Sequence, residues 1–432
     1  MTRIDGDPLQ VRHGAAKPSR RAFLKASTAS LAAASLAPPS VFAAGSDRIR
    51  VGLVGCGGRG CGAAVDCIGG NPGTELVALG DLFQDRLDGA RQVLQRELPA
   101  EAFRVMGDAC FVGFDAYRHV IASGVDLVLL ATPAHFRPIH LKAAVEAGKH
   151  AFIEKPVAVD PVGARSIIAS SELAAKKNLA IVAGAQRRHE TKYREVVRRV
   201  QDGAIGQLVG AQCYWYRGHL WVRDRQPQWS DMEWQIRNFV YFTWLCGDCI
   251  VETLLHNIDV VNWAFGGPPR SAVGIGGRQV RTEVKYGQVY DHFCVEYVYG
   301  KDVRTMAMCR EMPGCLERVA EKIIGTKGVA YCNEGVIAGE KPYRCTDPGR
   351  PYLQEQVDLV RSIRSGVPLN EGRRMAESTL TAVMGRMSAY TGQEVNWDFV
   401  ANKSQLDLSP AKYEFGEMPL PPVAQPGVTR LT

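Results

Sequence analysis

A lysine held between a glutamate and a proline is the first residue whose setting indicates chemistry. Lys155 lies between Glu154 and Pro156, and proline keeps the residue before it extended. The lysine ammonium is therefore aimed in one direction, where it could hydrogen-bond a hydroxyl and stabilise negative charge developing on that oxygen. The alternative is a surface ion pair between Lys155 and Glu154, which would need no ligand.

A histidine and two carboxylates recur at helical spacing in residues 250–263. We predict one buried helix, whose inward face carries Glu252, His256, Asp259 and Trp263. Ionisable groups in such a place are costly unless they are paired or used. A neutral His256 could take a proton from an alcohol, and Glu252 could orient the imidazole or hold its charge. The alternatives are a satisfied hydrogen-bond cluster and a zinc site; because no further close histidine or cysteine ligands are evident, we expect no metal.

Aromatic residues and arginines are interleaved in the stretch from Trp215 to Trp244. Aromatic faces beside polar hydrogen-bonding groups suit a sugar ring, and arginines could bind a substrate carboxylate. Trp234 and Arg237 are therefore candidates for substrate binding. The alternative is a long packed loop or an oligomer interface.

A glycine-rich turn follows the first predicted strand and supplies the scaffold for these groups. The apolar run Ile49–Val54 predicts a buried strand. In the turn after it, Gly55 would allow the tight bend, Gly57 would let the backbone approach a pyrophosphate, and Gly60 would let the next helix lie close to the sheet. The diphosphate would rest on amides at the helix N-terminus. The candidate cofactor-binding residues of this turn are Gly55, Gly57, Gly58, Arg59 and Gly60.

An acidic residue ends the second predicted strand, which covers residues 75–80. Asp81 can bind the ribose hydroxyls of an adenosine and repel a 2′-phosphate. The order of strand, glycine turn, helix, strand and acid therefore predicts a dinucleotide site, with NAD favoured over NADP. The alternative is a glycine turn without a phosphate, in which Asp81 caps a helix.

Strands and helices alternate through a predicted first domain, residues 45–185. Further buried strands are expected at 126–132, 150–156 and 180–184, and helices at 84–98, 136–148 and 161–177. This alternation predicts a parallel, doubly wound sheet. Ligands bind at the carboxyl ends of such strands, and the candidates there are Thr132, Pro133, Glu154 and Lys155.

The pattern of predicted strands and helices changes at about residue 186. Successive strands without intervening helices predict a largely antiparallel sheet, and so a second, α+β domain over residues 186–350. The strands are expected at 206–216, 272–279, 291–299, 303–309 and 321–325. Two helices within residues 351–408, at 352–364 and 371–390, are expected to pack back against the first domain. Residues 409–432 are a proline-rich, irregular tail that could form a wrapping arm.

The first 44 residues match an export signal. Ser19–Lys25 closely resembles a twin-arginine motif, and an alanine-rich stretch with small residues near 41–44 follows it. This stretch is too short and too weakly apolar to span a bilayer. We expect a periplasmic or secreted protein that folds, and can acquire a cofactor, before export. The alternative is a disordered basic arm.

Composition limits the classes of partner. The 432 residues are 46% hydrophobic and 22% charged, as in soluble globular enzymes of two or three domains. The formal net charge is +7, but residues 1–44 hold six basic and two acidic side chains, so that +3 remains for the rest. That is too little to indicate a nucleic-acid partner or a membrane surface. We expect neither nucleic-acid binding nor stable membrane insertion.

With these motifs in this order, the chain resembles the Gfo/Idh/MocA oxidoreductases from about Arg48 to Trp397. The resemblance implies a Rossmann domain followed by an α/β domain with a large, mostly antiparallel open sheet that often forms dimer or tetramer contacts. It implies oxidation or reduction of a sugar, polyol or related substrate with NAD or NADP. Lys155 corresponds to the family lysine and His256 to the catalytic histidine, whereas Glu252 stands where many members have aspartate. The proline after the lysine is often cis. Further candidates for substrate binding are Arg187, Asn257 and Asp259.

Three functions are compatible with these residues. The first is an NAD(P)-dependent dehydrogenase that uses Lys155 and His256 for acid–base chemistry. The second resembles the NAD-dependent glycosidases, in which transient oxidation allows elimination of the leaving group and the hydride then returns. The third is a sugar- or dinucleotide-binding protein without turnover. The intact lysine and histidine favour the first two.

Overall fold

The computed structural model describes residues 48–345, 347 and 349–432. The predicted twin-arginine signal lies outside these residues, so its assignment stays a prediction. Within the described part of the chain, no helix is long and apolar enough to cross a membrane.

The first sheet contains six parallel strands in the order β3-β2-β1-β4-β5-β6. The strands are β1 (Ile49–Val54), β2 (Thr74–Asp81), β3 (Cys110–Val112), β4 (Leu127–Leu130), β5 (His150–Ile153) and β6 (Ile181–Ala183). The sequence Leu-Val-Leu-Leu of β4 is buried at every position, as expected for a strand that is covered on both faces. The predicted parallel, doubly wound sheet is confirmed.

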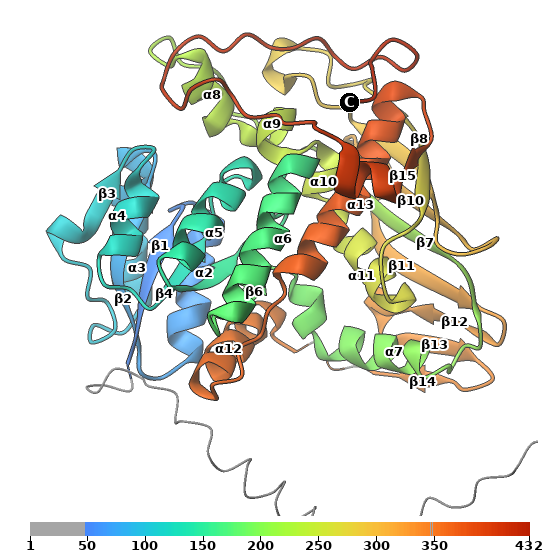
Figure 1. The fold of residues 1–432 in the computed structure, drawn as a ribbon, viewed down its shortest axis with the longest axis horizontal. Helices are drawn as coiled ribbons and strands as arrows, with labels where there is room; N and C mark the ends of the chain where they lie inside the picture. The colour runs from blue at the N-terminus through green and yellow to red at the C-terminus, as the bar shows by residue number, and fades with distance from the viewer. Residues whose placement is uncertain (1–47, 346, 348) are drawn as a thin grey trace, which may run out of the picture. The chain divides into compact units, whose positions relative to one another are not determined.

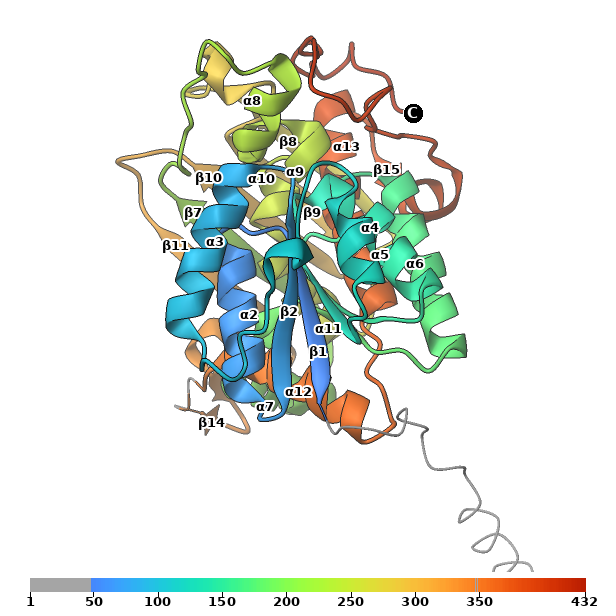
Figure 2. The same cartoon turned by 90° about the vertical axis from the view of Figure 1, so that its left-hand side faces the viewer.

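Helices cover both faces of this sheet (Figures 1 and 2). They are α2 (Gly58–Gly70), α3 (Gln84–Glu97), α4 (Ala116–Ala122), α5 (Arg137–Glu146) and α6 (Pro161–Lys176). In Figure 2, α2 and α3 lie on one side of the strands, and α4, α5 and α6 on the other. The strand order reverses between β1 and β4. Such a switch point, at the carboxyl ends of the strands, is where doubly wound sheets bind ligands.

The second sheet contains nine strands in the order β14-β13-β12-β11-β7-β10-β9-β8-β15. They are β7 (Leu208–Arg217), β8 (Ser271–Gly277), β9 (His292–Val298), β10 (Arg304–Glu311), β11 (Arg318–Gly325), β12 (Gly328–Tyr331), β13 (Val336–Gly339), β14 (Tyr343–Arg344) and β15 (Val395–Asn396). Every neighbouring pair is antiparallel except β7 and β10. The predicted mostly antiparallel sheet is confirmed. Two helices, α7 (Thr191–Gln201) and α11 (Leu255–Phe265), pack beside it.

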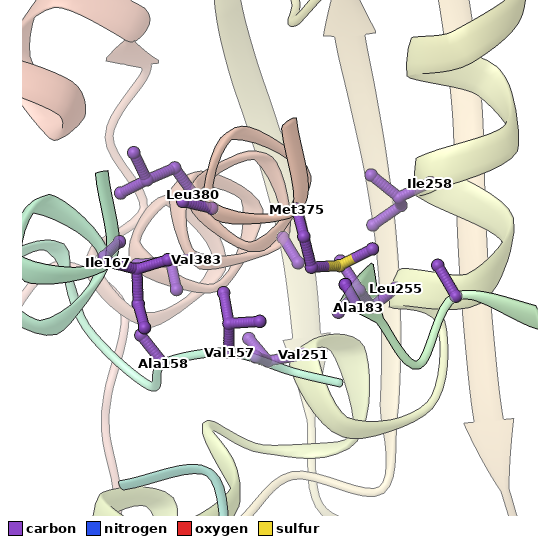
Figure 3. Close-up of a cluster of buried hydrophobic side chains, with 14 of the residues drawn as sticks. Val157, Ala158, Ile167, Ala183, Val251, Leu255, Ile258, Met375, Leu380 and Val383 are labelled. Atoms are coloured by element: carbon purple, nitrogen blue, oxygen red, sulfur yellow. The ribbon is translucent and has the colours of Figure 1, made fainter. Parts of the chain in front are cut away.

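Two late helices pack beside the first sheet and its helices. Helix α12 (Pro351–Arg364) packs against α2, and α13 (Gly372–Thr391) packs against both α6 and β8. Figure 3 shows α13 between the first half of the molecule, which contains the parallel sheet, and the second half, which contains the mostly antiparallel sheet. Leu380 and Val383 lie beside Ile167 of α6, and Met375 lies beside Leu255 and Ile258 of α11. Helix α13 therefore joins the two sheets through one apolar core.

The C-terminal residues 409–432 contain no helix or strand. Phe415 stacks on Phe83 of the first half. The Met418 carbonyl accepts a hydrogen bond from Gln235 of α8 (Asp231–Arg237) in the second half. The tail therefore contacts both halves of the molecule.

Replacing Leu380 by alanine should destabilise the whole described fold. Leu380 is fully buried, and removing such a leucine side chain typically costs about 2–5 kcal/mol because a cavity remains. We expect that decrease in the free energy of unfolding, measured by urea denaturation. The control is Val367→Ala at a residue that is 75% exposed, for which we expect a change within about 0.5 kcal/mol. A loss for Leu380→Ala no larger than the control would contradict the joining role of α13.

Candidate active site

A cavity of about 610 Å³ lies at the carboxyl ends of the first sheet and is also lined by residues of the second half. Its size is typical of small-molecule sites. Most of the sequence-predicted residues line it: Gly55, Gly57, Gly58, Arg59, Gly60, Asp81, Thr132, Pro133, Glu154, Lys155, Arg237, Glu252 and His256. The fold thus brings residues about 200 positions apart in the chain, such as Gly55 and His256, to one place.

The glycine turn has the geometry that the motif demands. Gly55 has φ +96°, and a Cβ there would lie 2.6 Å from the Ala131 carbonyl carbon. A Cβ on Gly60 would lie 1.9 Å from the Gly55 oxygen, whereas one on Gly57 would meet nothing within 4 Å. Because Gly57 borders the cavity and α2 begins at the next residue, the turn leaves room for a diphosphate against the helix amides. The residues present therefore fit a dinucleotide.

Asp81 holds the turn to the end of β2. One of its carboxylate oxygens accepts a hydrogen bond from the Cys56 amide (2.7 Å) and the other from the Phe83 amide (2.9 Å). Burial raises the pKa of this carboxyl group. Helix α3 begins at Gln84 without a side-chain cap, so the alternative of Asp81 as a helix cap is wrong.

Lys155 reaches across to the second half of the molecule. Its Nζ donates a hydrogen bond of 2.7 Å to the Glu252 carbonyl oxygen and lies 3.7 Å from the Glu252 carboxylate. Glu154 is buried and bonds to Arg59 (2.5 Å) and to the Lys155 amide. The alternative of a surface ion pair between Lys155 and Glu154 is therefore wrong. The Lys155–Pro156 peptide bond is cis, as the resemblance implied.

The predicted single helix over residues 250–263 is wrong, because the chain breaks it in two. Helix α10 (Cys249–Glu252) ends before α11 begins at Leu255. The Thr253 hydroxyl lies 2.7 Å from the Cys249 carbonyl and 3.0 Å from the Glu311 carboxylate of β10. At the break the His256 amide bonds to the Thr253 carbonyl. The Glu252 carbonyl is then available to Lys155.

His256 is half-buried at the cavity wall. Its ring stacks on Trp215, with centroids 5.7 Å apart and planes 20° apart. Burial, and then the positive charges of Lys155 and Arg187, hold the His256 pKa well below its ordinary value. Glu252 was expected to support this histidine, but its carboxylate instead lies near Lys155. Burial raises the Glu252 pKa, and one of its oxygens is buried without a hydrogen-bond partner in the described structure.

Four predicted substrate-binding residues do not line the main cavity: Arg187, Trp234, Asn257 and Asp259. Arg187 and Asn257 both bond to the buried Glu321 carboxylate. Asp259 accepts two hydrogen bonds from Arg188, of 2.7 and 2.8 Å. The charged groups of this cluster therefore pair inside the protein, whereas the Asn257 Oδ1 is buried without a hydrogen-bond partner among the described residues.

The positions of these four residues differ in detail. Arg187 and Asp259 border a void of about 10 Å³ that Lys155 and His256 also line. The Trp234 indole, on helix α8, is buried and donates to the Arg223 carbonyl, so in this structure it packs inside the protein. Their roles in substrate binding stay predictions.

Sequence reasoning missed several residues of the cavity wall. They include Phe83, Phe114, Phe136, Arg137, Gln186, Phe239 and Tyr352, whereas Trp221, from the predicted aromatic stretch, does line the cavity. Arg137 is the first residue of α5, four positions after Pro133, so its charge and its place just beyond the end of β4 were a usable signal. Tyr352 comes from α12, and no local pattern marks it. Within residues 48–345, 347 and 349–432, no group of three or more His, Cys, Asp or Glu side chains could hold a metal ion.

Two family models match most of the described chain. Residues 49–184 match "Oxidoreductase family, NAD-binding Rossmann fold", and residues 193–331 match "GFO/IDH/MocA C-terminal domain". The sequence is 30% identical over 208 residues to inositol 2-dehydrogenase 1 of Saccharopolyspora erythraea, covering 48% of this chain and 57% of that one. It is 24% identical over 229 residues to scyllo-inositol 2-dehydrogenase (NAD(+)) of Bacillus subtilis, covering 53% and 57%. The chain thus spans about half the length of the curated relatives it matches.

Solved structures share the fold over more of the chain. Apo scyllo-inositol dehydrogenase from Lactobacillus casei superposes with a TM-score of 0.63 at 20% identity, covering 81% of this chain and 98% of that one. Aldose-aldose oxidoreductase from Caulobacter crescentus gives a TM-score of 0.62 at 15% identity, covering 81% and 99%. At these identities the likeness establishes the fold alone.

The His256 imidazole should be uncharged at pH 6. Its pKa is lowered, so the neutral form should dominate from well below pH 6.5 upward. Long-range ¹H–¹⁵N NMR on protein with labelled histidines would follow the titration, and His256→Asn would assign the signal among the nine histidines. A midpoint at or above pH 6.5 would contradict the burial and the neighbouring charges described here.

Proposed function

Because the chain belongs to the Gfo/Idh/MocA oxidoreductase family, we propose that it is an NAD-dependent dehydrogenase. Its reaction is oxidation or reduction of a CH–OH group on a sugar, a polyol or a sugar derivative. One observation carries the proposal: Lys155 from the first half and His256 from the second meet in the cavity that the glycine turn borders. The names of the inositol dehydrogenase relatives support the substrate class.

The cofactor half of the cavity suits NAD better than NADP. The turn from Gly55 to Gly60 offers amides for the diphosphate, and Asp81 places a carboxylate where a 2′-phosphate would be repelled. Thr132 and Pro133 border the same space at the end of β4. When bound, NAD supplies the hydride acceptor for the oxidation.

Side chains of the protein carry out the transfer of the substrate hydroxyl proton. Neutral His256 accepts the proton of the substrate hydroxyl, because its depressed pKa keeps a lone pair available near neutral pH. Lys155 donates a hydrogen bond to the same oxygen and stabilises its developing negative charge. The Glu252 carbonyl and carboxylate hold the lysine ammonium in place. Glu252 thus positions Lys155 rather than the histidine.

The open face of the second sheet supports assembly into a homo-oligomer. Tyr214 and Tyr216 of β7 lie beside Met308 and Arg310 of β10, and all four are only half-buried in a single chain. A sheet with such a face is suited to pack against a second copy. Light scattering coupled to gel filtration should give a dimer or tetramer, and a monomer at micromolar concentration would contradict this part of the proposal.

Export to the periplasm rests on the twin-arginine motif at Arg20 and Arg21. We expect the full chain to reach the periplasmic fraction of a bacterial host, and a variant with both arginines replaced by lysine to remain in the cytoplasm. Equal distribution of the two proteins would contradict export by this route.

Replacing Lys155 by alanine should abolish turnover and leave nucleotide binding nearly intact. The lysine interacts with the reacting oxygen, so we expect kcat for NAD reduction to fall by about 10²–10⁴-fold. NADH affinity, measured by fluorescence titration, should change little. The matched control is Lys142→Ala, whose side chain is exposed on α5. Parallel loss of turnover and NADH binding would show a structural role for Lys155 instead.

A further inference from the structure

Arg137 is a buried cation at the wall of the candidate active site. Arg137 is the first residue of α5, and only 6% of its surface is exposed to solvent. It borders the same cavity as Lys155, Glu252 and His256. The mechanism proposed above gives it no role.

The guanidinium of Arg137 is poorly satisfied by the protein. Of its five N–H groups, one Nη1 donor bonds to the Pro156 carbonyl at 2.5 Å. Its Nε is buried without a partner among the described residues. No described carboxylate lies within 4.0 Å of it, since Arg137 forms none of the ion pairs in this part of the chain.

Other buried arginines of the described chain have better partners. Arg187, Arg188 and Arg281 each pair with a carboxylate. Arg386 donates to two backbone carbonyls, those of Val159 and Gly247. The Nε of Arg281 is also buried without a partner. Arg137 therefore differs from the first three in having no carboxylate partner, and from all four in lining the main cavity.

The two carboxylates whose charges act on Arg137 already form ion pairs with other residues. Glu252 interacts with Lys155, and Glu154 with Arg59. Burial lowers the Arg137 pKa, and both glutamates act on it only through space. A buried charge without a partner is costly. A ligand anion in the cavity would remove that cost.

We propose that Arg137 binds a carboxylate of the substrate, which makes the substrate a carboxylated sugar, such as a uronic acid or its glycoside. This inference rests on the proposed dehydrogenase function. A carboxylate matches the guanidinium fork with two parallel hydrogen bonds and restores charge balance, which a neutral hydroxyl does not. The Pro156 contact ties Arg137 to the residue next to Lys155. The carboxylate and the reacting hydroxyl would then be held at a fixed separation.

The first test is equilibrium binding, which needs no turnover. NADH-loaded protein would be titrated calorimetrically with glucuronate and galacturonate, and with the matched neutral sugars glucose and galactose. We expect at least one acid to bind about tenfold or more tightly than its neutral partner. In Arg137→Gln, which keeps a side-chain N–H donor but carries no charge, that preference should disappear. Arg137→Lys should keep part of it, because the charge stays and the fork is lost.

Two controls separate the possible outcomes. Arg96→Gln, at an exposed arginine of α3, should keep the wild-type preference. The NADH affinity of each Arg137 variant should match that of the wild type, and its melting temperature should not be lower. If the wild type binds neither acid more tightly than its neutral partner, the proposal is wrong. If Arg137→Gln weakens NADH binding instead, Arg137 contacts the cofactor and the proposal is also wrong.

A kinetic measurement distinguishes failure of this inference from failure of the proposed function. NAD reduction with the same four sugars gives the ratio of kcat/KM for acid over neutral substrate. We expect Arg137→Gln to lower that ratio by about 30-fold or more. Turnover of neutral sugars only, with an unchanged ratio in the variant, would overturn the carboxylate site and leave the dehydrogenase. Acid binding that depends on Arg137, without NADH formation from any sugar, would instead overturn the dehydrogenase.

Discussion

The hydrogen bond from the Lys155 ammonium to the Glu252 carbonyl is the contact on which the site depends. It joins the end of a parallel strand in one half to the end of a short helix in the other. The acceptor is available only because the helix breaks after Glu252, which leaves that carbonyl outside the helical ladder. A helix continuous through His256 would have used the same carbonyl internally. A local irregularity of the backbone therefore positions the lysine.

Buried ion pairs surround this contact and hold the break in place. Glu311 of β10 contacts Thr253 at the break and pairs with Arg281, and both partners of that pair are fully buried. On the far side of His256, Glu321 pairs with Arg187. Removing one partner of such a pair leaves an uncompensated charge, so these pairs resist rearrangement. Together with the apolar packing of α13 against both halves (Figure 3), they fix His256 and Lys155 relative to each other.

Local patterns were sufficient for the scaffold but not for the second half of the site. The glycine turn, the alternation of strands and helices, and the antiparallel strands after residue 206 follow from short-range periodicity, and the structure confirms them. The break at Thr253 depends on Glu311, which lies 58 residues away in sequence. Helical spacing alone therefore predicted a single helix. In the same way, Asp259 shares the spacing of His256, but Arg188 pairs with it inside the protein. Partners distant in the chain decide which polar groups face a ligand.

Hydride exchange between a CH–OH group and NAD is the reaction that we propose for this cavity. The most direct measurement is mass spectrometry of the nucleotide, after the purified protein has been incubated with NAD and a pool of neutral sugars, sugar acids and glycosides. The account predicts net conversion of NAD to NADH together with a substrate that is two mass units lighter. A glycoside that is cleaved while NAD stays oxidised would contradict net dehydrogenation and indicate redox-cycling hydrolysis. NAD that neither binds nor changes with any member of the pool would contradict the account altogether.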